Sequence, residues 1–296
     1  MDNLLAIDNW RRWSLFVRGR LHPLWFCARS SNTPITDNWD VTVVVVVRDM
    51  KATLLKALDS AATAIDHLRR CAPGGQLQAG ILVMDDHSED GSHDEAKAFA
   101  EASAVPMCIL RTSWHVGLTR CRNLAWQAAH SQWLFFLDAD NELVPEGLTR
   151  LHALALQHPE AAVVHGALRV WNAQGIPDDR MGVAAFDRNA ALELGPLHDI
   201  TALYNREKLA DVGGFDERLL LRLWGFEDFD LWMRLSGKGH QIVHQPILVG
   251  RILRSAQGFW ANRTMRSLDK VQEVFAQRFP GFVAYRRDLA PLHLDD

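Results

Sequence analysis

The sequence predicts an α/β protein with a mostly parallel central sheet and helices on both faces. From residue 41 onward, short apolar runs alternate with longer amphipathic segments, which is the pattern of successive β-α units. The apolar runs are unbroken, as expected for strands that are buried on both faces. Several of these runs end directly in acidic residues, so carboxylates are expected along one edge of the sheet.

The predicted elements follow in chain order. Residues 41–47 (VTVVVVV) form the first strand, because every residue in this run is β-branched. Residues 51–70 place apolar side chains at helical spacing and therefore form an amphipathic helix, which the sequence CAPGGQ ends. The remaining predicted elements are strands at 79–84, 105–110 and 133–137 and helices at 92–103 and 119–130.

Composition narrows the class of protein. The 296 residues are 48% hydrophobic and 23% charged, which is typical of a soluble globular protein, and the net charge of -4 gives no nucleic-acid footprint. Cys27, Cys71, Cys108 and Cys121 are widely spaced, which favours free thiols in a reducing cytosol. Neither a secretory signal nor an apolar run of the ~20 residues that a membrane helix needs is present, so we expect a cytoplasmic protein.

Residues 1–39 differ from the rest because tryptophans and phenylalanines are mixed with arginines. One interpretation is an N-terminal extension whose aromatic side chains pack on the surface of the main domain. The alternative is a basic amphipathic patch at residues 10–27 that contacts a partner protein or the inner face of a membrane.

Charged residues follow three of the predicted strands where each strand ends: Arg48, then Asp85 and Asp86, then the pair Asp138 and Asp140. Open α/β sheets bind ligands at the carboxyl ends of their strands. Two neighbouring carboxylates are costly to remove from water unless a cation neutralises them. That cation is a metal ion or the side chain of a lysine or arginine. The alternative is that both carboxylates stay in solvent at an exposed turn. The sequence therefore predicts the functional site at this edge.

Six segments, in this order, resemble the family-2 glycosyltransferases of the GT-A (Rossmann-like) fold across residues 41–250. They are VTVVVVV, ILVMDDHSEDGS, HVGLTRCRNLAWQAA, WLFFLDAD, LYNREKLADVGGFDE and WGFEDFDLWMRL. The resemblance implies a hexosyltransferase-type enzyme that uses a UDP-, GDP- or dTDP-sugar. It also implies a hydroxyl acceptor on a glycan or lipid-linked molecule, such as a bacterial-type surface glycan.

On the donor side, the resemblance assigns Asp86 to the nucleotide base, although a turn cap explains the same residue. Asp138 and Asp140 match the family's DxD, which holds Mn2+ or Mg2+ on the sugar diphosphate, and both ions prefer oxygen ligands. Asp140 is the expected direct ligand, with Asp138 nearer the sugar or ribose. Arg122 is expected to contact the nucleotide from a helix for which Thr119 is the predicted N-cap.

On the acceptor side, the resemblance assigns Asp228 as the general base of an inverting transfer, with Glu227 beside it toward the acceptor. The alternative is that these acids only stabilise the start of a helix, where negative charge is favourable. Gly213 and Gly214 are expected to allow a close approach of the backbone.

The chain departs from the family pattern in three places. Arg48 lies where relatives carry an aromatic residue against the base, so we expect its guanidinium to stack there. The segment GRILRSAQG lacks the histidine that completes the metal site in many relatives, so the metal has fewer protein ligands or Arg251 or Arg254 helps to neutralise phosphate. Residues 166–200 carry few motifs. Their candidate contacts with the acceptor are Trp171, Arg180, His198 and Asp199, although each of these residues could instead pack within the protein or lie in a solvated loop.

Two other functions fit part of the pattern. A haloacid-dehalogenase-type phosphatase also places D-x-D after an apolar strand, but Glu142 stands where that chemistry requires threonine or valine. A transferase-like domain that only binds a glycan or partner is the second alternative, and it is disfavoured because the DxD and the base are both present.

The predicted organisation has three parts. Residues 1–39 are the N-terminal aromatic and basic extension. Residues 40–250 are the GT-A domain, with a nucleotide-binding half at 40–145 and an acceptor half at 146–250. Residues 251–296 are a C-terminal helical tail.

Overall fold

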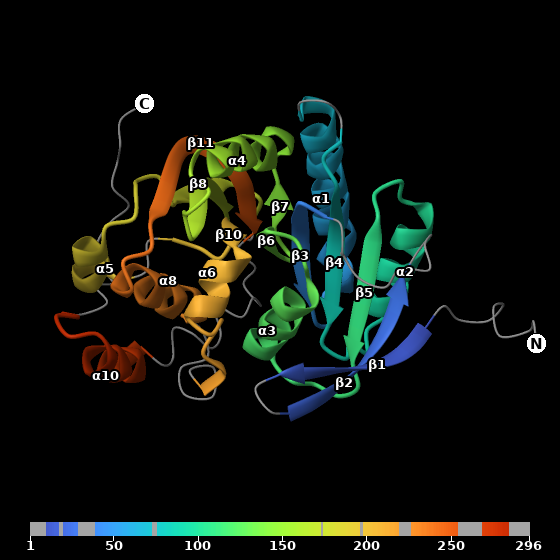
Figure 1. The fold of residues 1–296 in the computed structure, drawn as a ribbon, viewed down its shortest axis with the longest axis horizontal. Helices are drawn as coiled ribbons and strands as arrows, with labels where there is room; N and C mark the ends of the chain where they lie inside the picture. Colours follow the sequence, from blue (N-terminus) through green and yellow to red (C-terminus); the bar gives the residue numbers. More distant parts are fainter. Residues whose placement is uncertain are drawn as a thin grey trace, which may run out of the picture.

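A computed structural model describes residues 10–17, 20–28, 39–72, 76–172, 174–195, 198–218, 226–253 and 268–283. The described residues form one mixed sheet with helices on both faces (Figure 1). The strands are β1 (Trp10–Val17), β2 (Arg20–Ala28), β3 (Val41–Val47), β4 (Ala79–Asp85), β5 (Met107–Thr112), β6 (Trp133–Asp138), β7 (Glu142–Leu143), β8 (Val163–Trp171), β9 (Pro177–Met181), β10 (Leu203–Asn205) and β11 (Ile242–Leu253). The helices are α1 (Lys51–Cys71), α2 (Ser92–Ala102), α3 (Leu118–Ala128), α4 (Pro145–Gln157), α5 (Arg188–Leu194), α6 (Arg206–Asp211), α8 (Glu227–Gly237) and α10 (Leu268–Arg278).

The strand order places the predicted polar edge at a reversal of the chain. The order is β1-β2-β5-β4-β3-β6-β10-β8-β11-β7, with β9 beside β8. The central strands β5, β4, β3 and β6 are parallel, and the chain adds β4 and β5 on one side of β3 but β6 on the other. Ligand sites of open α/β sheets lie at such a reversal. The register pairs Val47 with Asp85 and Val46 with Asp138, so the strand-ending acids share one edge.

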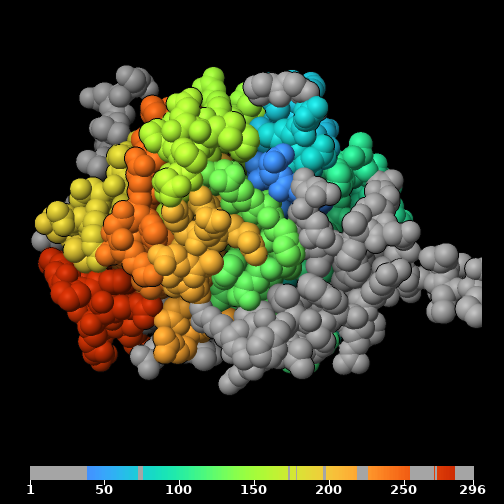
Figure 2. All heavy atoms as spheres, in the orientation of Figure 1, coloured from blue at the N-terminus to red at the C-terminus, as the bar shows by residue number. Residues whose placement is uncertain are grey.

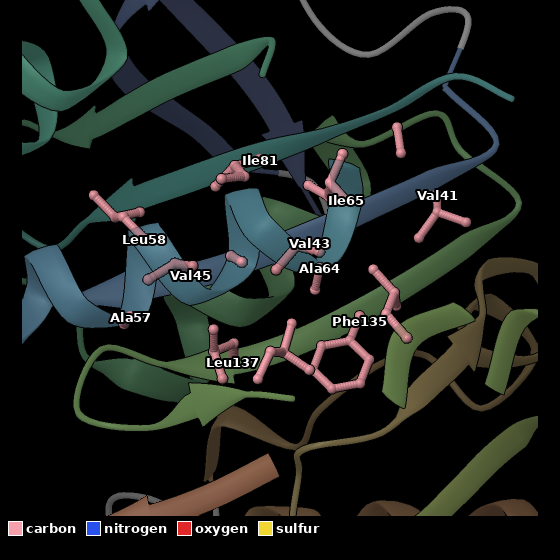
Figure 3. Packing of buried hydrophobic residues seen from close by; sticks show 14 of the residues in the cluster. Val41, Val43, Val45, Ala57, Leu58, Ala64, Ile65, Ile81, Phe135 and Leu137 are labelled. Carbon is pink, nitrogen blue, oxygen red and sulfur yellow. The ribbon is translucent and has the colours of Figure 1, made fainter. Parts of the chain in front are cut away.

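Strand β3 is buried on both faces, as the unbroken apolar run predicts. Val43 and Val45 point into a core formed with α1, α2 and α4, whereas Val44 points toward α3, α6 and α8. Figure 3 shows Leu58 and Ile65 of α1 over the first of these faces. Complete burial of one such aliphatic side chain contributes roughly 1.5–3 kcal/mol, so the centre of the sheet is a rigid base for the site.

The predicted class and central elements are confirmed, and the differences have local causes. Strand β5 begins at Met107 rather than at residue 105, because Pro106 has no N–H to donate to a neighbouring strand. Thr119 is not the N-cap of α3 and that prediction is wrong. The helix begins at Leu118 after Gly117, whose φ is +95°, and Thr119 is buried within the first turn.

The N-terminal residues add a hairpin to the sheet. Strand β1 pairs with β2, and β2 runs antiparallel to β5 from Leu24 opposite Thr112 to Ala28 opposite Cys108. The hairpin therefore covers an edge of the parallel sheet that would otherwise expose unpaired backbone groups. The side chains of residues 10–27 lie outside the described set, so their contact with a membrane or partner stays a prediction. No helix in the described ranges is both long enough and apolar enough to cross a bilayer.

The C-terminal residues return to the second half of the sheet. Strand β11 continues to Leu253, beyond the predicted boundary at 250, because it pairs with β8 as far as Trp171. Helix α10 then lies against α8 and the end of α5, where Figure 2 shows the red C-terminal residues next to the orange and yellow ones. The division of the chain at residues 39 and 250 stays a prediction.

A turn at Gly213 and Gly214 brings the segment before α8 into contact with α3. Gly213 and Gly214 have φ of +75° and +69°. A Cβ on Gly214 would lie 2.5 Å from Asn123 Oδ1 and 2.6 Å from Trp126 Nε1. The Asn123 side chain accepts a hydrogen bond from the Phe215 N–H and donates one to the Phe215 carbonyl, each at 2.9 Å. The predicted close backbone approach is confirmed.

We expect Gly214→Ala to lower the unfolding free energy by roughly 2–5 kcal/mol, because a left-handed backbone and a displaced neighbour both add cost. Gly175→Ala is the matched control, since Gly175 has φ of +73° but no atom within 4 Å of its added Cβ. The control should lose only about 1–2 kcal/mol. Urea unfolding of both variants measures the difference, and equal losses would show that the Asn123 contact carries no constraint.

Candidate active site

Two pairs of acidic residues meet at the carboxyl edge of the sheet. Asp138 ends β6, and Asp140 follows in a tight turn that the Asn141 N–H closes by donating to the Asp138 carbonyl at 3.0 Å. Glu227 and Asp228 are the first residues of α8. The apolar face of this helix packs in the core cluster that also contains α3 and the central strands. The predicted site residues of both halves are therefore close together.

Arg122 of α3 links the two acid pairs. Its side chain is 2% exposed, its Nη2 donates to Asp138 Oδ1 at 2.6 Å, and its Nη1 donates to the Glu227 carboxylate. Burial by itself lowers the pKa of Arg122, but the charges of Asp138 and Glu227 outweigh burial and raise that pKa above the ordinary arginine value. The guanidinium therefore stays charged. The resemblance predicted that Arg122 contacts the nucleotide and that Glu227 lies toward the acceptor. In the structure, the two side chains form an ion pair with each other.

Asp140 differs from Asp138 because it has no basic partner among the described side chains. Burial, followed by the charge of Asp138, raises the pKa of Asp140 to about 7. The same two causes raise the pKa of Asp199 to about 6, although Thr201 donates two hydrogen bonds to that carboxylate. The site thus holds more carboxyl groups than cations.

This donor set fits a hard divalent cation. Mg2+ and Mn2+ commonly take one or two carboxylates from the protein and complete their shells with water and substrate phosphates. Asp138 and Asp140 supply such carboxylates, while the described residues contain no group of three His, Cys, Asp or Glu side chains that could hold a metal alone. Arg251 pairs with Glu142 at 3.5 Å, and Arg254 lies outside the described residues.

Asp228 borders a small pocket. Burial, followed by the charges of Glu227 and Asp199, raises the pKa of Asp228 well above its ordinary value. His198 stacks on Trp232 with ring centroids 4.9 Å apart, and both rings line the pocket. The other lining residues are Phe186, Ala191, Gly195 and Phe229.

The sequence candidates for acceptor contacts therefore divide into two groups. His198 lines the pocket, and Asp199 lies close enough to Asp138 and Asp228 for their charges to interact. Trp171 and Arg180 lie instead on the β8–β9 hairpin and do not line the pocket.

The structure gives Asp86 several protein donors. The N–H groups of Val116 and Gly117 donate to its carboxylate at 2.7 and 2.9 Å, and His115 Nδ1 lies 2.7 Å from it. Asp86 thereby holds the loop that begins α3, which is distant in the sequence, whereas the local Ser88 N–H donates to Asp85 Oδ1 at 2.9 Å. Its contact with a nucleotide base stays a prediction.

Arg48 lies at the same edge, with its guanidinium 3.4 Å from Asp49 and partly exposed. The Asp49 N–H donates to Ser88 Oγ at 3.0 Å, and the Glu89 N–H donates to Asp49 Oδ1 at 2.8 Å. The turns after β3 and β4 are therefore joined, and the stacking of Arg48 on a base stays a prediction.

Sequence reasoning missed Arg278 of α10, which forms an ion pair with Asp230 of α8 at 2.5 Å. No pattern signals this pair, because the two residues belong to different elements and come together only through packing. The hydrogen bond from Trp232 Nε1 to the Tyr204 hydroxyl at 2.8 Å was missed for the same reason.

We expect Asp140→Asn to change how stability depends on pH. The pKa of Asp140 rises from its ordinary value of 3.8 to about 7 in the folded protein. The folded protein therefore keeps a proton that the unfolded chain has released, and its unfolding free energy falls as pH rises from about 4 to about 7.

The asparagine cannot ionise, so the variant should match the wild type near pH 4 and exceed its melting temperature above about pH 7 in EDTA. Asp59→Asn, which removes an exposed carboxylate of α1, controls for the loss of one negative charge. Parallel melting curves for wild type and Asp140→Asn across this range would contradict the shift.

Comparisons with known proteins were made by sequence and by structure. A family model described as glycosyl transferase family 2 matches residues 42–211. The amylovoran biosynthesis glycosyltransferase AmsE of Erwinia amylovora is 20% identical over 164 residues, which cover 53% of this chain and 58% of AmsE. The chain thus spans less than two thirds of that relative's length.

Two solved structures share the fold. S. aureus TarS 1-349 in complex with UDP-GlcNAc has a TM-score of 0.62 at 15% identity, over 83% of this chain and 68% of that chain. The mannosyltransferase PcManGT from Pyrobaculum calidifontis, in complex with GDP-Man and Mn2+, has a TM-score of 0.58 at 18% identity, over 83% and 66%. These likenesses confirm the expected GT-A fold. Because the family model matches more than half of the residues, the chain belongs to glycosyl transferase family 2.

Proposed function

We propose that the chain is a glycosyltransferase that moves a sugar from a nucleoside-diphosphate sugar to a hydroxyl group of a glycan or lipid-linked acceptor, with inversion. The observation that carries this proposal is the meeting of the Asp138–Asp140 pair with the Glu227–Asp228 pair across Arg122. One pair suits a diphosphate and its cation, and the other suits a hydroxyl nucleophile. The ligands in the TarS and PcManGT structures support a nucleotide-sugar donor.

On the donor side, Asp138 and Asp140 would hold Mn2+ or Mg2+, an assignment that the Mn2+ in the PcManGT structure supports. The ion would neutralise the negative charge of the leaving diphosphate. Asp140 is the proposed direct ligand, because no described basic side chain forms an ion pair with its carboxylate. Arg122 is 2% exposed, so its proposed role is to orient Asp138 rather than to touch the nucleotide.

On the acceptor side, Asp228 is the proposed general base. A carboxylate whose pKa is raised by burial is a stronger base than an exposed one, and it can take the proton of the acceptor hydroxyl. The acceptor oxygen then forms a bond to the anomeric carbon on the face opposite the diphosphate. The bond to the diphosphate breaks, its electron pair leaves with the phosphate oxygen, and the proton remains on Asp228.

The surroundings of Asp228 support this role. The ion pair of Glu227 with Arg122 holds the first residue of α8, directly before Asp228. His198 stacks on the buried ring of Trp232, and both residues border the small pocket beside Asp228.

We expect donor binding to require a divalent cation. In a thermal-shift panel of UDP-, GDP- and dTDP-sugars, one nucleotide class should raise the melting temperature only with Mn2+ present, because a ligand that binds the folded state stabilises it. Asp140→Ala should abolish both the shift and donor hydrolysis, whereas Asp59→Ala on α1 should change neither. Undiminished affinity in EDTA for every sugar that binds would exclude the metal role.

We expect Asp228→Asn to lower the rate of sugar transfer by about 10²–10⁴-fold while donor affinity stays near wild type, because the amide cannot accept the proton. Asp94→Asn in the first turn of α2 is the control for losing an acid at a helix start, and it should only lower stability slightly. Transfer rate, donor affinity and melting temperature separate the two roles. Turnover within a few-fold of wild type would exclude Asp228 as the base.

A further inference from the structure

Helix α10 packs against α8, the helix whose first residues are the proposed acceptor-side acids. The ring of Phe229 on α8 lies 5.0, 6.3 and 6.0 Å from the rings of Phe275, Phe279 and Phe282. These four side chains are buried in one apolar cluster together with Met233. The contact is therefore a packed core, in which the C-terminal segment supplies three of the rings that support α8 on this side.

The residue immediately before the acid pair has a strained backbone. Phe226 adopts φ of +64° and ψ of 18°, a left-handed conformation that is unfavourable for a bulky side chain. Such a conformation persists only where the surrounding structure holds it. Phe226 is 5% exposed, and its ring meets the ring of Phe275 edge-on with centroids 6.2 Å apart. Helix α10 thus provides a contact that holds this residue.

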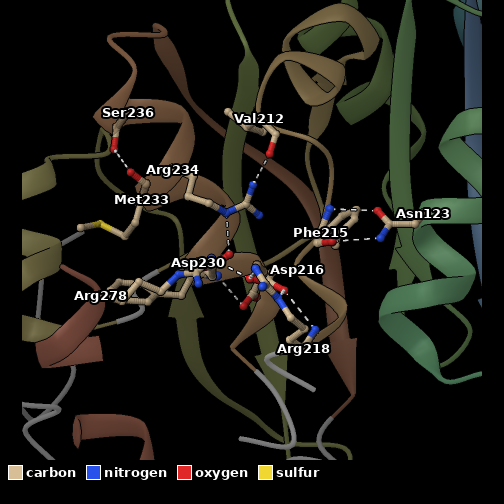
Figure 4. A network of polar contacts seen from close by, with 12 residues as sticks. Asn123, Val212, Phe215, Asp216, Arg218, Asp230, Met233, Arg234, Ser236 and Arg278 are labelled. Atoms are coloured by element: carbon tan, nitrogen blue, oxygen red, sulfur yellow. Dashed lines mark hydrogen bonds and ion pairs between the residues drawn. The ribbon is translucent and has the colours of Figure 1, made fainter. Parts of the chain in front are cut away.

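A polar contact reinforces the apolar one. Arg278 Nε lies 2.5 Å from Asp230 Oδ1, and its Nη2 donates to Asp216 Oδ2 at 3.0 Å (Figure 4). Asp230 is fully buried in the first turn of α8, and its other oxygen accepts a hydrogen bond from Arg234 Nε at 2.7 Å. Arg278 therefore joins the start of α8 and the segment after Gly214 to the C-terminal helix.

We propose that residues 268–283 are a positioning element for the Glu227–Asp228 pair, with Arg278 and Phe275 as the positioning residues. The proposal rests on the proposed function of that pair. Neither side chain is a catalytic residue, because each acts through α8 rather than on the substrate. Both α8 and α10 lie beyond residues 42–211, the part of the chain that the family model matches.

The test compares Arg278→Ala with Arg278→Lys and with a matched control, Arg218→Ala. Arg218 is 85% exposed and pairs with the same Asp216 at 3.2 Å, but no contact joins it to Asp230. A 1 Å misplacement of a catalytic group can cost about 100-fold in rate, so Arg278→Ala should lower kcat by about 10- to 100-fold. Its donor affinity should stay unchanged, Arg278→Lys should recover part of kcat, and Arg218→Ala should match the wild type.

Hydrogen exchange of the full chain provides a readout that does not depend on activity. Arg278→Ala should speed exchange in peptides covering residues 226–231 while peptides covering β3 keep their wild-type rates. Phe275→Leu, which keeps apolar volume but loses the ring contact with Phe226, should produce the same local change and serves if Arg278→Ala does not fold. Equal behaviour of Arg278→Ala and Arg218→Ala, or faster exchange spread evenly over the sheet, would overturn the proposal.

The two proposals can fail separately. A wild-type protein that neither transfers nor hydrolyses any nucleotide sugar would overturn the proposed function, whatever the exchange data show. A wild-type protein that transfers sugar, with unchanged kcat and unchanged local exchange in Arg278→Ala, would overturn the positioning role alone.

Discussion

The buried guanidinium of Arg122 joins the two halves of the candidate active site, because it is the shared partner of the acid that ends β6 and the acid that begins α8. Removing one partner from a buried ion pair costs about 3–5 kcal/mol, since the remaining charge stays out of water. The spacing between the end of β6 and the start of α8 therefore depends on one cation on a third element, α3. With Asp138 occupied in this way, Asp140 has no ion-pair partner among the described side chains, and burial raises its pKa to about 7.

The sheet gives this arrangement its rigidity. The central strand β3 is buried on both faces and ends between the acids of β4 and β6, so the polar edge rests on a fully buried strand. Groups that must be placed accurately are better held by strands and helices than by loops. The acids that end β6 and begin α8 meet this requirement, whereas the loop residues near Asp86 depend on hydrogen bonds that the carboxylate itself provides.

Much of the centre of the fold could be predicted because its signals are local. Unbroken apolar runs identify β3, β4 and β6, and acids directly after such runs identify the edge where the site lies. The resemblance indicated an anionic partner for Arg122, the nucleotide. The sequence did not indicate that the partner would be Glu227, because that pairing depends on how α8 packs.

Three other features were missed for related reasons: the β1–β2 hairpin, the Arg278–Asp230 pair and the left-handed Phe226. Each depends on contacts between distant segments, and a positive φ is expected at glycine or asparagine rather than at phenylalanine.

The packing of α10 on α8 also orders events in time. A chain is synthesised from its N-terminus and its early parts begin to fold first, so the whole sheet precedes α10 at the ribosome. The acids of β6 and α8 would then be present before the aromatic cluster that supports α8 is complete. The step that makes the nascent protein competent would be the docking of one short helix onto a preformed domain. Until α10 has been synthesised, α8 lacks the ring of Phe275 and the guanidinium of Arg278 as partners.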